Sequence, residues 1–187
     1  VIGSDGETRF REFGSLPERQ EEVIESELEE VCGVIREVIE RSFAHRVSFR
    51  VPTGGLLSGG LDSSVVNAIG MRRYRERFGG GARFKTFALG VGESEDIRYA
   101  RIMSQHIGSE HEELLVGLDD MLEVLPDVLY ALESFDPSLV RSSISNYLIS
   151  RHASGMGIEE LLSGEGGDEV FCGYMYFKDF PVSEYFG

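Results

Sequence analysis

Cysteine is scarce in this sequence, as are the signals typical of exported or membrane-bound proteins. The 187 residues include two cysteines, Cys32 and Cys172, too few for a disulfide framework and without partners at the spacing of zinc ligands. No apolar run is long enough to span a membrane, and the first residues do not show the basic-then-apolar order of a signal peptide. We therefore expect a cytoplasmic protein with no membrane partner.

Basic residues are also fewer than acidic ones. The chain has 18 lysines and arginines against 33 aspartates and glutamates, which gives a formal net charge of −15. A surface of that sign repels the phosphate backbones of DNA and RNA, so we expect no nucleic-acid partner. The acidic residues are spread along the chain, which favours a role in solubility over a dedicated acidic tail.

Apolar residues make up 41% of the chain, and their periodicity changes several times along it. A long amphipathic helix is predicted from about residue 15 to residue 45. Short apolar runs typical of strands then alternate with helical patterns. The predicted strands are 51–57, 84–89, 111–116 and 158–162, and the predicted helices are 61–78, 94–107, 118–132 and 142–153. This alternation predicts an α/β protein, a parallel sheet with helices on both faces and strand 51–57 in a central position.

Three local signals refine this outline. Residues 1–14 alternate weakly around the turn dipeptide Asp5-Gly6 and predict a short hairpin or strand. Ser15 followed by Glu18 matches a capping box at the start of the first helix. Pro126 is expected to kink or split helix 118–132.

A glycine-rich loop follows the first predicted strand and reads Ser58-Gly59-Gly60-Leu61-Asp62-Ser63-Ser64. Its glycines allow a sharp turn, and the N–H groups at the start of the next helix attract an anion. Asp62 suits an anion site if Mg²⁺ bridges its carboxylate to phosphate oxygens. No lysine follows the glycines, which excludes the G-x-x-x-x-G-K-[ST] loop. The alternative is a plain glycine turn before a serine-capped helix.

The loop resembles the PP-loop of ATP pyrophosphatases, which holds the pyrophosphate released when a substrate is adenylylated. That resemblance implies a Rossmann-like sheet and the use of ATP. The superfamily is broad, since it includes asparagine synthetases, tRNA-thiolating enzymes, argininosuccinate synthetases and GMP synthetases.

A second glycine-rich loop, Ser163 to Glu169, follows the last predicted strand. Three of its residues are carboxylates, Glu165, Asp168 and Glu169, which repel one another unless a cation or positive partner is near. Both loops follow strands of a parallel sheet, so we expect them at one edge, with Asp62 and Asp168 around one Mg²⁺. A solvated acidic turn is the alternative.

This second stretch resembles the S-G-E-G-[SG]-D-E-x-F-G-G-Y segment of asparagine synthetases and their β-lactam synthetase relatives. Phe87-Ala88-Leu89-Gly90 resembles the family's adenine-binding strand, and residues 133–141 resemble the segment that meets the acyl-adenylate. The resemblance covers roughly residues 50–181. Cys172 stands where the family usually has glycine, and we expect a small packed side chain there rather than a reactive thiol.

The resemblance implies an enzyme that joins a carboxylic acid, expected to be aspartate, to AMP and then transfers ammonia to give asparagine. It implies that Glu165 takes a proton from the attacking amine, that Arg141 stabilises the anionic intermediate, and that Asp62 and Asp168 bind Mg²⁺. The residues implied to bind ATP and pyrophosphate are Leu56, Ser58, Gly59, Gly60, Leu61, Asp62, Ser63, Ser64, Leu89, Ser163 and Gly164.

Parts of the family pattern are not found in this sequence, which begins at Val1. Neither the glutaminase domain nor the helical half with the lysine expected to pair with Glu169 is recognisable. We interpret residues 1–14 as a remnant of the glutaminase domain and 15–187 as the ATP-binding core. We expect a separate glutaminase to supply ammonia. We also expect the chain to pair with a complementary C-terminal half or to form a homo-oligomer. Alone, the chain is expected to make little asparagine. A cyclising β-lactam-synthetase-like enzyme and a nucleotide-binding module without catalysis stay open as alternatives.

Overall fold

A computed structural model describes residues 28–92, 94–175 and 177 of the chain. The chain divides into two units, Val1–Val38 and Ile39–Gly187. Helix α1 (Leu28–Arg46) begins in the first unit and ends in the second. The hairpin predicted at 1–14 and the capping box at Ser15 lie outside the described residues.

The second unit alternates strands and helices, as the sequence predicts. Its elements after α1 are β1 (Thr53–Leu56), α2 (Leu61–Phe78), β2 (Lys85–Gly90), α3 (Glu95–Ile107), β3 (Glu110–Leu115), α4 (Leu118–Leu132), α5 (Pro137–Gly155), β4 (Glu160–Leu162) and α6 (Gly167–Phe171). All four predicted strands are confirmed. Each end of a strand differs from the predicted residue by two positions or fewer. Helix α6 was not predicted, and α5 begins earlier than residue 142.

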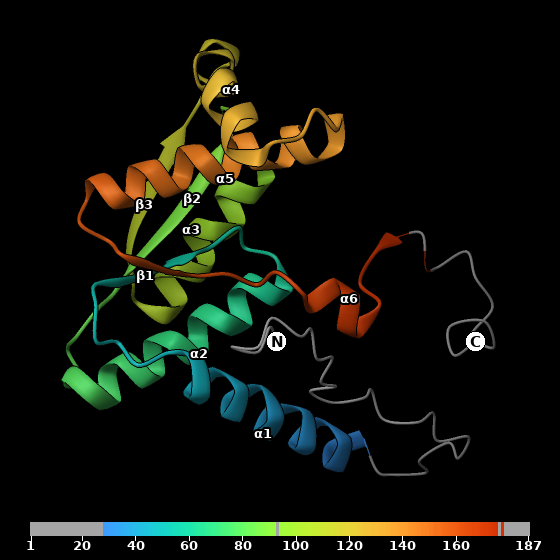
Figure 1. The fold of residues 1–187 in the computed structure, drawn as a ribbon. Helices are drawn as coiled ribbons and strands as arrows, with labels where there is room; N and C mark the ends of the chain where they lie inside the picture. Colours follow the sequence, from blue (N-terminus) through green and yellow to red (C-terminus); the bar gives the residue numbers. More distant parts are fainter. Residues whose placement is uncertain (1–27, 93, 176, 178–187) are drawn as a thin grey trace, which may run out of the picture. The chain divides into compact units, whose positions relative to one another are not determined.

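The four strands form one parallel sheet in the order β3-β2-β1-β4. Strand β1 lies inside the sheet, with Leu56 opposite Phe87 of β2 and Gly55 opposite Leu162 of β4. Figure 1 shows α5 crossing one face of this sheet and α3 lying on the other. The predicted parallel sheet with helices on both faces is therefore confirmed.

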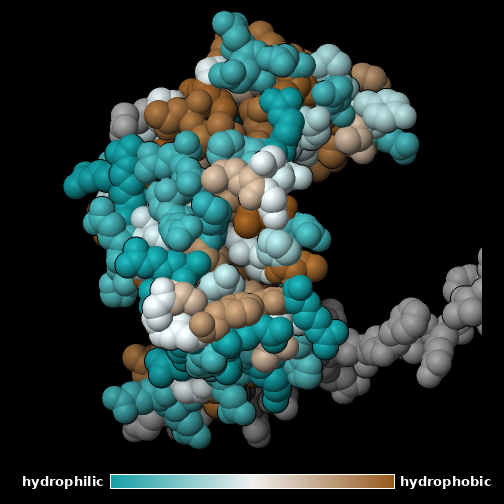
Figure 2. Space-filling view, turned by 90° about the vertical axis from the view of Figure 1, so that its left-hand side faces the viewer, coloured by the Kyte–Doolittle hydropathy of each residue, from teal (hydrophilic) through white to brown (hydrophobic). Residues whose placement is uncertain are grey.

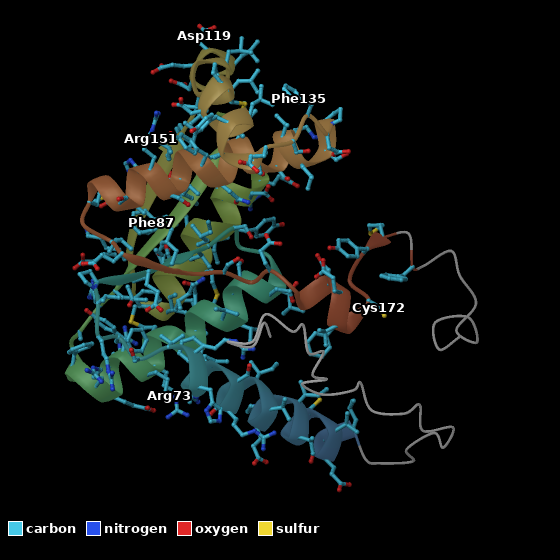
Figure 3. The ribbon with its side chains drawn as sticks, in the orientation of Figure 1. Arg73, Phe87, Asp119, Phe135, Arg151 and Cys172 are labelled. Carbon is cyan, nitrogen blue, oxygen red and sulfur yellow. The ribbon has the colours of Figure 1, made fainter. Side chains whose placement is uncertain are left out.

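Alternating side chains of β2 divide the core between the two faces. Ala88 packs with Ile97 and Ala100 of α3 on one face. Phe87 packs on the opposite face against Ile149 and Ala153 of α5, and Figure 3 labels this ring between β2 and α5. Successive residues of a strand point to opposite faces of the sheet, so helices on both faces pack against the same short strand β2.

On the α3 face, α2 is held by a further cluster of buried side chains. Met71 of α2 and Ile107 of α3 pack with Phe84, Phe43 and Leu162. Because Phe43 belongs to the end of α1 and Leu162 to β4, this cluster ties the last strand to the first helices of the unit. Leu162 therefore packs against the middle of α2, where Gly70 and Met71 lie.

The helix ends follow local signals that can be read in the sequence. Ser94 caps α3 by accepting a hydrogen bond from the N–H of Ile97 at 3.3 Å, and Gly108 ends it with φ of 70°. Asp136 caps α5 by accepting from the N–H groups of Ser138 and Leu139 at 2.9 and 3.0 Å. Pro126 lies inside α4 without splitting it.

The surface of this unit is apolar in places. Figure 2 shows hydrophobic residues gathered at the top of the view, where Figure 1 places α4. Leu118 and Leu122 of α4 and Leu115 of β3 are among the large exposed apolar side chains. None of the helices that the structure describes is long and apolar enough to cross a bilayer.

Candidate functional site

The first glycine loop joins β1 to α2, and its backbone N–H groups are suited to an anion. Gly60 is the N-cap residue of α2, and no side chain caps the helix there. The N–H groups of a first helical turn have no partner inside the helix, and the helix dipole makes that end positive. The start of α2 therefore offers a set of aligned donors to a phosphate group.

Serine hydroxyls hold the loop in this shape. The N–H of Gly60 donates to Ser58 Oγ at 3.3 Å, and Ser63 Oγ donates to the carbonyl of Gly60 at 3.2 Å. The two hydroxyl oxygens of Ser58 and Ser63 lie 3.0 Å apart. Both hydroxyls thus lie at the same end of α2 as the free N–H groups.

Gly59 is required by both its conformation and its surroundings. Its φ of 81° lies in the left-handed region that favours glycine. A Cβ at this position would stand 2.5 Å from the Tyr99 carbonyl carbon and 2.6 Å from the Ala100 nitrogen. The loop backbone therefore rests directly on α3, which supports it.

The second glycine loop lies against the first. A Cβ on Gly164 would stand 2.6 Å from the Ser63 nitrogen and 2.8 Å from the Asp62 carbonyl carbon. A Cβ on Gly167 would stand 2.6 and 2.8 Å from the two carboxylate oxygens of Asp62. The structure therefore brings the two loops to one edge of the sheet, as their positions after parallel strands predict.

The acidic residues of the second loop point in different directions. Asp168 faces Gly173, since a Cβ on Gly173 would stand 3.0 Å from Asp168 Cγ and nearer still to Oδ1. Glu165 is exposed, and its N–H donates to Ser163 Oγ at 3.2 Å. Tyr174 donates a hydrogen bond from its hydroxyl to Glu169, and this bond lowers the pKa of Glu169.

The carboxylates present fit a Mg²⁺ ion only in part. Among the residues that the structure describes, no three His, Cys, Asp or Glu side chains lie close enough to hold a metal. Mg²⁺ bound with a nucleotide commonly takes one or two carboxylates and completes its shell with phosphate oxygens and water. Asp62, placed where the two loops meet, suits that pattern, whereas Asp168 faces Gly173.

The remaining predicted site residues are distributed unevenly. Leu56 and Leu89 are half-buried and lie on the α5 face of the sheet, packed with Phe87. Leu61, within the first loop, is 78% exposed. Arg141 is exposed on α5, and within the described ranges no hydrogen bond or ion pair links its guanidinium to either loop. The structure thus places Leu56 and Leu89 at strand ends near the loops, and Arg141 on the exposed surface of α5.

Cys172 does not have the packed side chain expected from the sequence. It is exposed and ends α6 with φ of 54°, in the left-handed region. Figure 3 labels it at the end of that helix. Glycine takes such a conformation at less cost than cysteine.

Asn67 was not among the predicted site residues, yet it is bonded to both sides of the first loop. Its side chain is fully buried, and Nδ2 donates to the carbonyls of Leu56 at 2.7 Å and Ser63 at 2.8 Å. The sequence shows only an asparagine among apolar neighbours on α2 and two glycines in β1, and the structure places one of them, Gly55, against Asn67. Glycine inside a strand often marks a close approach of another group.

A second polar cluster lies away from the loops, near the amino ends of β2 and β3. Thr86 Oγ1 lies 2.8 Å from Ser109 Oγ and 3.0 Å from His111 Nδ1. Arg101 donates to Glu113 at 2.6 and 2.7 Å, which lowers the pKa of Glu113. Burial lowers the pKa of His111, whose Nε2 has no hydrogen-bond partner among the described residues.

Comparisons with a family model and with curated proteins point to one family. The model of the family described as asparagine synthase matches residues 34–186. Asparagine synthetase B [glutamine-hydrolyzing] of Escherichia coli is 38% identical over 154 residues, which cover 79% of this chain and 28% of that protein. A probable asparagine synthetase [glutamine-hydrolyzing] of Dictyostelium discoideum is 36% identical over 171 residues, 88% of this chain and 30% of that protein.

Among solved structures, an NH3-dependent NAD synthetase from Campylobacter jejuni is similar with a TM-score of 0.46 and 13% identity, over 80% of this chain and 61% of that chain. The chain spans less than a third of the length of the two curated relatives above. The family match extends over most of the sequence and includes both glycine loops. The chain therefore belongs to the asparagine synthase family.

Proposed function

We propose that this chain binds ATP where its two glycine loops meet, as the ATP-binding part of an amide-forming synthetase. The observation that carries this proposal is the packing of Gly164 on the backbone of Asp62 and Ser63. That contact joins an anion-binding helix start to an acidic loop at the carboxyl edge of a parallel sheet. Ligands of such sheets bind at that edge.

In this proposal the start of α2 holds the pyrophosphate portion of ATP. Negative charge grows on the leaving pyrophosphate as a carboxylate joins the α-phosphate. N–H donors already aimed at that position, with the hydroxyls of Ser58, Ser63 and Ser64, stabilise this charge without rearrangement. Asp62 would hold Mg²⁺, which would supply positive charge against the phosphate oxygens, and Asp168 would have to turn away from Gly173 to join it.

The nucleotide and acyl ends would lie along the neighbouring strand ends. Leu56 and Leu89 offer apolar surface on the α5 face, and Ser163 and Gly164 border the loop junction. Glu165, exposed at that junction, is suited to take a proton from an attacking amine. Arg141 would need to approach the junction in order to stabilise the intermediate.

The substrates and partners follow from the family and belong to the same proposal. They are ATP, a small carboxylic acid expected to be aspartate, and ammonia. The two curated relatives described above are named as glutamine-hydrolysing, so a glutaminase is the proposed source of ammonia. A complementary helical half or a second copy of the chain would supply the cation expected to pair with Glu169. The cytoplasm is the proposed location.

Gly164 provides a direct test with a matched control. Gly164→Ala places a Cβ against the Ser63 nitrogen, whereas a Cβ on Gly155 meets nothing within 4 Å. We expect Gly164→Ala to weaken binding of Mg·ATP to the full chain about tenfold or more, measured by isothermal titration calorimetry. Gly155→Ala should bind as the wild type does. Equal affinity in both variants would contradict a site at the loop junction.

A further inference from the structure

Asn67 is fully buried in the second turn of α2 and makes two short hydrogen bonds from one amide group. Its Nδ2 donates at 2.7 Å to the carbonyl of Leu56, the last residue of β1, and at 2.8 Å to the carbonyl of Ser63. Leu56 precedes the first glycine loop and Ser63 lies near its end. One side chain therefore connects the two ends of the loop.

The space for this amide is provided by Gly55 of β1. A Cβ on Gly55 would stand 2.8 Å from Asn67 Cγ and nearer still to Oδ1. No other residue type at position 55 leaves room for the asparagine without a shift of strand or helix. Gly55 and Asn67 thus form a matched pair across the interface between β1 and α2.

The amide is not simply a favourable core contact. Its Oδ1 is buried without a hydrogen-bond partner among the described residues, and an unpaired buried acceptor opposes folding. An apolar side chain of the same shape would avoid that cost. The favourable effect of Asn67 lies in its two Nδ2 bonds, both of which end on the backbone that flanks the loop.

We propose that Asn67 is a positioning residue, which sets the distance between the end of β1 and the first turn of α2 and so the shape of the pyrophosphate cradle. This inference rests on the proposed function, because the cradle is the part of the site that it shapes. Asn67 does not touch the ligand itself. It acts through Leu56 and Ser63.

Asn67→Leu separates positioning from stability. Leucine has nearly the same shape as asparagine but cannot donate to either carbonyl, and it removes the unpaired Oδ1. We expect the melting temperature to change little, because losing the two Nδ2 bonds and removing the unpaired Oδ1 have opposite effects, while the affinity for Mg·ATP falls about tenfold. The affinity for AMP, which has no pyrophosphate portion, should stay within a factor of two.

The double variant Gly55→Ala/Asn67→Ala is the second arm. Asn67→Ala alone should lower the melting temperature because it leaves a hole, and the methyl group that Gly55→Ala adds should partly fill that hole. We expect the double variant to recover stability without recovering affinity for Mg·ATP. Recovery of stability and affinity together would show that Asn67 only fills space, and would overturn the inference.

Amide hydrogen exchange tests the positioning role of Asn67 without any ligand. In the wild type the Nδ2 bonds should hold the first turn of α2, so the amide of Ser64, which donates to the Gly60 carbonyl at 3.0 Å, should exchange slowly. In Asn67→Leu it should exchange several-fold faster while amides in β2 do not change. Unchanged exchange at Ser64 would overturn the positioning role. A wild-type chain that binds no Mg·ATP would instead contradict the proposed function.

Discussion

The carboxylate of Asp62, at the start of α2, lies directly against Gly167, the first residue of α6. No Cβ fits between them, since it would stand 2.6 and 2.8 Å from the two carboxylate oxygens. The contact joins residues from the two glycine loops and places an acid beside an anion-binding helix start. A bound cation would neutralise the Asp62 carboxylate, and a phosphate held by that cation would accept hydrogen bonds from the helix start. The proposed ATP site requires this arrangement.

Gly167→Ala should disturb this contact without changing the charge of the site. The new methyl group must push the Asp62 carboxylate away, so we expect binding of Mg·ATP to weaken about tenfold. Binding of AMP should change far less, because AMP does not need the pyrophosphate and metal portion. Titration calorimetry with both nucleotides measures the difference. Gly117→Ala, whose Cβ would meet only Asp120 at an ordinary 3.6 Å, is the matched control.

Cys172→Gly should stabilise the chain. Cys172 has φ of 54°, where a residue with a Cβ is strained by about 1 kcal/mol relative to glycine. The greater freedom of glycine in the unfolded chain offsets part of this gain. We therefore expect a modest rise in the urea midpoint with an unchanged slope. Cys172→Ser keeps the Cβ and removes only the thiol, so a rise of the same size in that variant would contradict the argument from φ.

As the pH falls, protonation of His111 should destabilise the chain at a higher pH than protonation of the carboxylates does. Burial lowers the pKa of His111 below its ordinary 6.5, so below that pH the unfolded chain binds more protons than the folded one. Stability is therefore expected to fall as the pH drops below about 6.5. The pKa of Glu113 is also lowered, by the hydrogen bond from Arg101, and its contribution is lost only at lower pH.

Urea unfolding between pH 7.5 and 5 measures this dependence. His111→Gln should flatten the stability curve in that range, while replacement of the exposed His106 by glutamine should leave the slope as it is in the wild type. If the slope persists in His111→Gln, the buried imidazole is not its source.

The local parts of the structure could be predicted from the sequence because their signals are local. The segment from Ser58 to Ser64 follows an apolar strand and opens an amphipathic helix, so its place at the sheet edge followed from the order of elements. Ser94 and Gly108 marked both ends of α3 in the same way. The contact between the two loops followed from the parallel sheet, whose strand ends share one edge.

Contacts between side chains on different elements could not be predicted in this way. Asn67 matters because Gly55, on a different element, leaves space for its amide, and no pattern along the chain encodes that pairing. Asp136 caps α5, but its resemblance to a substrate-binding segment obscured the ordinary capping signal before Pro137. The exposure of Cys172 depends on how α6 ends, and this short helix was not predicted.

Binding of nucleotides to the full chain and to Asp62→Ala tests the central claim most directly. If the two glycine loops form one ATP site, the wild type binds Mg·ATP, and Asp62→Ala weakens that binding at least tenfold while binding of AMP changes little. The measurement is titration calorimetry with Mg·ATP and AMP on both proteins. A wild type that does not bind Mg·ATP, or an equal loss of both nucleotides in Asp62→Ala, would contradict the claim.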